Sequence, residues 1–253
     1  MRWGCCTTID NLSILERIGY DYVELTMVSI ADSARYGEIR QAVAKSGLRA
    51  EAFNVLLPQE IKIVGPDVDW ELIRKYIGTV FPRARALGGE VVVFGSGRSR
   101  RVPEGFPRDQ AHRQAVDFVE FVGETGASHD LLIGIEPLRS MECNLINRID
   151  EADRVAQEID QASVGVLADF YHMMEGGEPL ENIANCDSQL IHVHLADTGR
   201  LWPGSGAYDY DSFFNHLKQA RYDGRMSLEC SYDDFPENAK AALAFLKDKW
   251  HEA

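Results

Sequence analysis

Residues 190–220 read LIHVHLADTGRLWPGSGAYDYDSFFNHLKQA and contain a complete strand, loop and helix pattern. The run 190–197 is apolar and β-branched until it ends in polar residues, which is typical of a strand buried in a parallel sheet. Residues 210–220 follow an aspartate and carry apolar side chains at helical spacing, which is typical of an amphipathic helix. The stretch therefore predicts one β-strand followed by one α-helix.

The same pattern recurs along the whole chain. Seven more short apolar runs end in polar residues, at 2–8, 20–26, 48–55, 90–96, 131–136, 164–169 and 226–231. Helix-like segments lie between them, at 10–18, 36–47, 69–89, 109–126 and 150–159. Eight such runs without a linker predict an α/β protein with a single domain, residues 1–253, folded as a (β/α)8 barrel. A doubly wound open sheet is the alternative, but no G-x-G-x-x-G follows the first strand, and eight runs favour closure.

Charge and cysteine content limit the partners and the compartment. The chain has 26 basic and 40 acidic side chains, a net charge of −14, so its surface repels nucleic acid and anionic membranes. The five cysteines contain no C-x-x-C pair, which favours reduced thiols in the cytoplasm. The start has no signal-peptide layout, and no apolar run reaches membrane-spanning length. We expect a cytoplasmic protein that acts on a small molecule, either as a monomer or as a homo-oligomer.

Ionisable side chains stand at or near the ends of the last four strand-like runs. These are Glu136, Asp169, His194 and Glu229, separated by 33, 25 and 35 residues. Because functional groups of such barrels stand at the carboxyl ends of the strands, these four should converge at the barrel mouth. Three adjacent carboxylates repel one another, and a divalent cation relieves that repulsion. The oxygen-rich set predicts a metal site, for Mn²⁺ first and for Mg²⁺ or Co²⁺ as alternatives.

Two further features have a structural and a functional interpretation. His192 shares a strand face with His194, so we expect it one layer deeper, filling the barrel interior. The stretch FGSGRSRRVPEGF, 94–106, contains Arg98, Arg100 and Arg101. A solvated basic loop is the simpler interpretation of that stretch, and docking of a phosphate or carboxylate is the alternative.

Several motifs in the second half of the chain occur together in one known family. They are EPLRSME (136–142), DFYH (169–172), HVHLADTGR (192–200), PGSGAYDY (203–210) and MSLEC (226–230). In this ordered set the chain resembles the sugar phosphate isomerase/epimerase superfamily of xylose isomerase-like barrels, and most of all its D-tagatose and D-psicose 3-epimerases. The resemblance implies that Glu136 and Glu229 transfer protons while also binding the metal with Asp169 and His194. It also implies that Glu142, His172 and Arg200 bind the substrate.

The reaction implied is proton transfer next to a sugar carbonyl through an enediolate, with ketose 3-epimerisation as the first expectation. Epimerisation needs a base on one face of the carbon and an acid on the other, which gives both glutamates a role. The alternatives are a hydroxypyruvate isomerase, which the chain length suits, and an inosose dehydratase-type lyase. Endonuclease IV shares the barrel but needs more histidines and a basic groove. A sugar-binding barrel without activity would not need two opposed glutamates.

Overall fold

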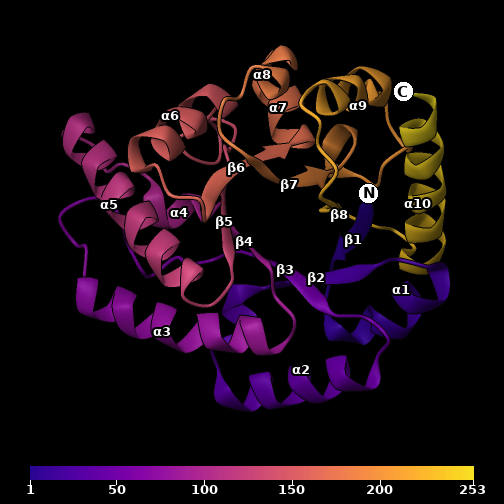
Figure 1. The fold of residues 1–253 in the computed structure, drawn as a ribbon, viewed down its shortest axis with the longest axis horizontal. Coiled ribbons are helices and arrows are strands. Elements are labelled where there is room, and N and C mark those ends of the chain that lie inside the picture. The colour runs from indigo at the N-terminus through magenta and orange to yellow at the C-terminus, as the bar shows by residue number, and fades with distance from the viewer.

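Eight parallel strands close into a barrel in the computed structural model, which describes residues 1–253. Each strand pairs with the next, and β1 pairs with β8 to complete the ring, with Trp3 opposite Met226 (Figure 1). The strands are β1 (Arg2–Cys6), β2 (Tyr22–Thr26), β3 (Ala50–Asn54), β4 (Val91–Phe94), β5 (Leu132–Ile135), β6 (Val164–Asp169), β7 (Leu190–Leu195) and β8 (Arg225–Leu228). The predicted (β/α)8 barrel is confirmed.

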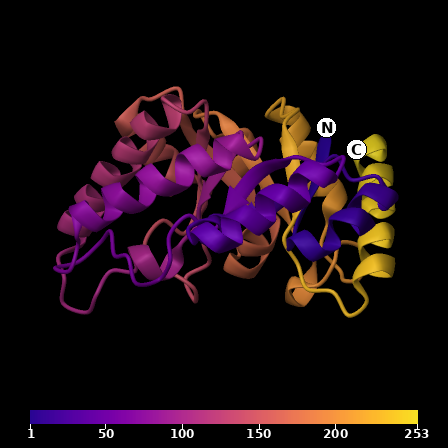
Figure 2. The ribbon, with the colours of Figure 1, turned by 90° about the horizontal axis from the view of Figure 1, so that it is seen from below.

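Helices surround the barrel and cover the outer face of its sheet (Figure 1). They are α1 (Leu12–Ile18), α2 (Ser33–Lys45), α3 (Trp70–Ala86), α4 (Gly97–Arg100), α5 (Arg108–Ala127), α6 (Ile149–Ile159), α7 (Phe170–Gly176), α8 (Glu181–Ala184), α9 (Tyr210–Gln219) and α10 (Phe235–Glu252). Three 3-10 turns, η1 (Ile9–Asn11), η2 (Met27–Ile30) and η3 (Thr198–Arg200), lie in the loops. Figure 2 shows the two termini near each other on one side of the molecule. No helix has both the length and the apolar character needed to cross a membrane.

The main hydrophobic core lies between the barrel wall and the helices. It is one cluster of 60 buried residues, to which the strands and the helices contribute. Phe118 of α5 and Phe213 of α9 are fully buried in it. Burying aromatic side chains of this size is among the largest contributions that single residues make to stability.

The barrel interior has its own small apolar layer. Six buried residues fill it: Tyr22, Ala52, Val91, Val93, Leu167 and Ile191. The Tyr22 ring occupies the space where a Cβ on Gly4 would stand, so a side chain at position 4 would displace the ring. The Tyr22 hydroxyl lies 2.8 Å from Ser227 Oγ, which satisfies the buried hydroxyl. The interior is therefore filled at this level by side chains, and Glu24 and His192 add polar groups to it.

Candidate metal centre and active site

Four side chains at the carboxyl ends of β5 to β8 meet at the barrel mouth. Glu136 directly follows β5, Asp169 ends β6, His194 lies near the end of β7 and Glu229 directly follows β8. One ligand atom from each lies within 4.8 Å of those of the other three. The Nδ1 atom of His194 is 2.9 Å from Glu136 Oε1, 3.8 Å from Asp169 Oδ2 and 3.7 Å from Glu229 Oε2. The structure thus brings together the four residues that the strand ends singled out.

The three carboxylates of this cluster carry more negative charge than the single imidazole can balance. Burial, together with the carboxylate of Glu136, raises the pKa of Glu229 despite the opposing charges of His194 and Arg200. Burial alone would lower the pKa of His194, but the carboxylates around it raise that pKa well above its ordinary value. Burial opposes ionisation of Asp169 as well, and the charges of His172 and His194 nevertheless lower its pKa. One imidazole therefore shares its positive charge among three carboxylates, and a divalent cation would meet the same need more fully.

The donor set also fits such a cation in chemical type. Three carboxylates and one imidazole nitrogen suit Mn²⁺, Mg²⁺, Co²⁺ or Zn²⁺, and the set contains no thiolate. Gly95, directly after β4, leaves the space that the Glu136 carboxylate occupies, because a Cβ at this position would collide with Glu136 Oε2. A side chain at position 95 would displace one of the candidate ligands.

The second nitrogen of His194 contacts a residue that the sequence patterns did not single out. Glu24, in β2, is fully buried in the barrel interior, and its Oε1 lies 2.9 Å from His194 Nε2. Its Oε2 lies 2.8 Å from Nε2 of His192, which is also fully buried. His192 therefore lies inside the barrel, as expected. Although burial opposes ionisation, the two histidines lower the pKa of Glu24, so the carboxylate stays charged. A buried carboxylate that contacts the nitrogen of a ligating histidine facing away from the metal fixes the orientation of the ring and raises its basicity.

Replacing Glu24 with glutamine is expected to weaken Mn²⁺ binding by about 10- to 100-fold, because the amide keeps an acceptor for His194 but loses the charge. The measurement is the Mn²⁺ dissociation constant by titration calorimetry. Glu51→Gln is the matched control: Glu51 is also a buried carboxylate in the barrel, but it contacts Arg2 and Arg225 instead of a histidine. Equal Mn²⁺ affinities for both variants would show that Glu24 only fills space.

Arg200 reaches the cluster from the loop after β7. Its Nη2 pairs with Glu229 Oε2, and its Nη1 lies 3.6 Å from Glu142 Oε1. Its backbone has a φ of +61°, a region that arginine rarely adopts. Buried Asp197 stabilises this loop, since its carboxylate accepts hydrogen bonds from the backbone of Gly204 at 3.0 Å and of Tyr208 at 3.2 Å. A residue held in a strained backbone conformation by its surroundings is a feature common at functional sites.

His172 is positioned by Asp169, one of the candidate ligands. Asp169 is the N-cap of α7, and its Oδ1 accepts a hydrogen bond of 2.8 Å from the backbone N–H of His172. The His172 ring is buried, with Nδ1 4.0 Å from Glu142 Oε1 and without a hydrogen-bond partner. Buried polar atoms are normally paired, so this nitrogen is available to a molecule that enters the site.

The sequence patterns assigned no role to three further side chains near the mouth. Tyr171 lies between two guanidinium groups, with Arg139 Cζ 5.0 Å and Arg200 Cζ 5.1 Å from the centre of its ring. Arg139 also donates a hydrogen bond of 2.9 Å to Glu142 Oε1. Asn54 closes β3 and donates a hydrogen bond of 2.9 Å to Glu229 Oε1. Nothing in the sequence distinguishes Tyr171 of α7, Arg139 in the loop after β5 or Asn54 at the end of β3 from their neighbours, so only their contacts reveal them.

The basic stretch after β4 divides into two parts. Arg100 is fully buried and donates hydrogen bonds to the backbone oxygens of Phe94 at 2.9 Å and Glu136 at 2.6 Å. The expectation that Arg100 belongs to a solvated or ligand-docking loop is therefore wrong. Its guanidinium is buried and holds the backbone near Glu136 in place through hydrogen bonds. Arg98 and Arg101 are exposed.

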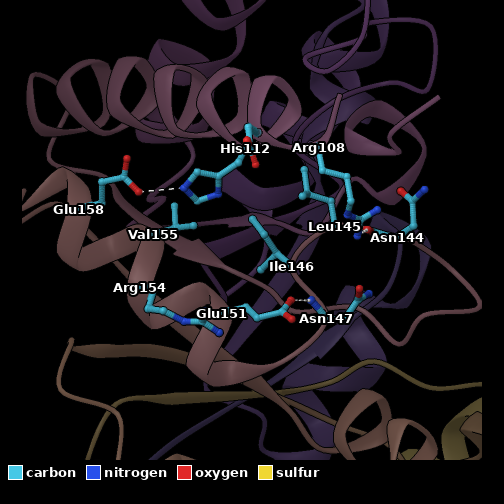
Figure 3. Close-up of a pocket in the computed structure, with 11 residues that line it drawn as sticks. Arg108, His112, Asn144, Leu145, Ile146, Asn147, Glu151, Arg154, Val155 and Glu158 are labelled. Atoms are coloured by element: carbon cyan, nitrogen blue, oxygen red, sulfur yellow. Dashed lines mark hydrogen bonds and ion pairs between the residues drawn. The ribbon is translucent and has the colours of Figure 1, made fainter. Parts of the chain in front are cut away.

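A separate hollow lies between the starts of α5 and α6 (Figure 3). Its volume is about 410 Å³, and its walls include an ion pair of 2.9 Å between His112 and Glu158. None of the four strand-end residues lines it. This hollow is thus distinct from the cluster at the barrel mouth.

Fold and site together define a (β/α)8-barrel enzyme with a candidate metal centre at the carboxyl ends of its strands. The chain belongs to the xylose isomerase-like TIM barrel family, whose sequence profile matches residues 12–249. The 3-dehydro-D-guloside 4-epimerase of Escherichia coli K12 is 28% identical over 182 residues, which are 68% of this chain and 70% of that enzyme. The L-ribulose 3-epimerase of Methylomonas sp. strain DH-1 is 25% identical over 265 residues, covering 99% of this chain and 88% of that one.

Solved structures show the same fold. The D-psicose 3-epimerase of Clostridium cellulolyticum H10, crystallised with D-tagatose, superposes with a TM-score of 0.86 at 17% identity and covers 99% of both chains. The relatives are sugar epimerases and isomerases, and this chain is an enzyme of the isomerase class.

Proposed function

We propose that this protein is a metal-dependent sugar epimerase that inverts a carbon next to a carbonyl group, with ketose 3-epimerisation as its reaction. The observation that supports this most is the pairing of two carboxylates, Glu136 and Glu229, around one histidine nitrogen. They come from β5 and β8, which are not neighbours in the barrel, so a substrate between them would meet a carboxylate on each side.

Glu136, Asp169, His194 and Glu229 would hold the cation, for which we propose Mn²⁺. When bound, a divalent cation polarises the substrate carbonyl and stabilises the negative charge that develops on its oxygen. Glu24 would keep the His194 ring in place, since it contacts the nitrogen that faces away from the cluster.

The two glutamates would exchange the proton. One carboxylate removes the proton from the carbon on one face, and the other, protonated, returns a proton on the opposite face. Because its pKa is raised, Glu229 suits the donor role in one direction of the reaction. In the reverse direction the two residues swap roles, since both directions pass through the same transition states.

Three residues would bind and orient the sugar. Arg200 and His172 would donate hydrogen bonds to the oxygens that gain negative charge, because Arg200 contacts Glu229 of the cluster and the Nδ1 atom of His172 has no partner. Glu142 would accept a hydrogen bond from a hydroxyl, and Arg139 fixes its carboxylate. Preorganised donors of this kind stabilise developing charge more strongly than water does.

The test is a panel of ketoses, ketose phosphates, hydroxypyruvate and inososes, incubated with the Mn²⁺-loaded enzyme in D₂O and followed by NMR. A 3-epimerase interconverts two ketoses of equal mass and introduces deuterium at C3. Conversion of an aldehyde to a ketone, or loss of water, would instead identify an isomerase or a dehydratase. No conversion of any of these compounds would contradict the proposed function.

A further inference from the structure

Two loops on the catalytic side of the barrel enclose a second hollow. They follow β3 and β4, so they leave the carboxyl ends of strands, as the candidate ligands do. In Figure 2, loops coloured purple and magenta extend beyond the helices at the lower left. The hollow has a volume of about 730 Å³. Its walls hold four cationic side chains: Lys62, Arg98, Arg101 and Arg108.

These cations are not neutralised by carboxylates. None of the four lies within 4.0 Å of a carboxylate oxygen of Asp or Glu. Lys62 donates a hydrogen bond of 2.6 Å to the backbone oxygen of Gln59, and Arg108 donates one of 2.8 Å to the backbone oxygen of Asn144. Arg98 contacts the side-chain oxygen of Gln59. Arg101 donates two hydrogen bonds, to the backbone oxygens of Met141 and Glu142. Each guanidinium has five N–H donors, so most of them stay free after one or two such contacts.

The balance of charge in the hollow is positive although the protein is acidic. Two carboxylates, Asp67 and Glu104, also line it, against the four cations. The chain as a whole carries −14, and such a surface repels anions. A local excess of positive charge beside the barrel mouth would offset that repulsion at one place.

The hollow adjoins the proposed substrate site. Arg101 donates a hydrogen bond of 3.0 Å to the backbone oxygen of Glu142. A smaller hollow of about 390 Å³ is lined by Arg98, Arg101 and Glu142 together. The Glu142 carboxylate in turn lies 3.6 Å from Arg200. Contacts therefore run from the cationic hollow to the candidate active site through one loop.

Arg108 marks the outer boundary of the hollow. Figure 3 shows it beside Asn144 at the edge of the hollow between α5 and α6, and both residues line the two hollows. The ion pair of His112 with Glu158 belongs to the outer hollow alone. Arg108 and Asn144 thus mark the place where the two hollows meet.

We propose that Lys62, Arg98, Arg101 and Arg108 bind an anionic group, a phosphate or a carboxylate, at the far end of an elongated sugar derivative. This inference rests on the proposed function and narrows its substrate class, because the sugar carbons would react at the cluster while the anion occupies the cationic hollow. Arginine suits this task, since its planar guanidinium forms two parallel hydrogen bonds to phosphate or carboxylate oxygens.

The test compares the Mg²⁺-loaded wild type with the double variant Arg98→Gln/Arg108→Gln. Inorganic phosphate and acetate are titrated by calorimetry, and KM is measured for D-ribulose against D-ribulose 5-phosphate and for D-fructose against D-fructose 6-phosphate. The double variant should weaken the binding of at least one anion by about tenfold or more, since it loses two charged hydrogen-bond donors. It should raise the KM of the phosphorylated sugars by a similar factor and leave that of the parent sugars unchanged. Arg113→Gln, an exposed position of α5 outside both hollows, is the control and should match the wild type.

Unchanged binding of both anions, or an equal rise in KM for charged and neutral sugars, would overturn the inference. If the double variant weakens the binding of acetate but not of phosphate, the anionic group of the substrate is a carboxylate rather than a phosphate. If no sugar reacts, the calorimetry still decides on the anion site, while the failure to react counts against the proposed function alone.

Discussion

Glu136→Gln and Glu229→Gln are each expected to lower kcat for epimerisation by about 10³-fold or more, because each removes one of the two proposed proton-transfer groups. The amide keeps an oxygen that can face the cation, so the loss should come mainly from proton transfer. One half-reaction should survive in each variant, since the remaining glutamate can still remove and return a proton on its own face. The two variants should therefore exchange the C3 proton with D₂O in opposite epimers.

The measurement is the loss of the C3–H signal by NMR, with each variant incubated separately with each epimer. Glu175→Gln serves as the control, because Glu175 lies near the mouth, bonded to Tyr208, but outside the cluster. It should retain kcat within about tenfold of the wild type. If one glutamate variant exchanges both epimers and the other exchanges neither, a single residue transfers all the protons. That outcome would favour an isomerase or a dehydratase.

Removal of divalent metal is expected to abolish activity and to lower the melting temperature by about 5–10 °C relative to enzyme held at about 100 times the dissociation constant of Mn²⁺. The physical reason is that the cation binds the folded site and relieves the repulsion among Glu136, Asp169 and Glu229. Mn²⁺ or Co²⁺ should restore both properties. Calorimetry and an activity assay before and after EDTA treatment measure the two effects.

Two variants distinguish the metal ligands from the residues that only lie near them. His194→Ala should lose the stabilisation by metal, because it removes the nitrogen at the centre of the cluster. His172→Ala should keep it, since we assign His172 to the substrate. Full activity of the stripped enzyme would contradict the metal proposal, and loss of the metal-dependent shift in His172→Ala would contradict the ligand assignment.

Much of the candidate site was predictable because a barrel repeats one local unit. Each strand-like run ends at the mouth, so an ionisable residue near the end of a run identifies a mouth residue without any knowledge of its distant contacts. For this reason Glu136, Asp169, His194 and Glu229 could be named from the sequence, and the structure brings them together. The family resemblance likewise indicated Arg200, which reaches the cluster from the loop after β7.

The residues that escaped prediction depend on contacts across the barrel. Glu24 sits in a run where a carboxylate could equally be solvated, and its partners His192 and His194 lie 168 and 170 positions away. β2 and β7 are not neighbours in the sheet, so only closure of the ring brings their inward side chains together. The same holds for Tyr171 of α7, whose ring lies beside Arg139 and Arg200 from two separate loops.

The sequence by itself determined the barrel, the level at which the ionisable side chains stand and the sign of the overall charge. These depend on local periodicity and composition, which act over a few residues or over the whole chain. Only the tertiary structure decided which nitrogen of His194 faces the other three residues of the cluster, and that Arg100 is buried while Arg98 and Arg101 stay free. Burial and orientation depend on neighbours that are distant in sequence, and a guanidinium in a loop carries the same local signal whether it orders the backbone or faces an open hollow.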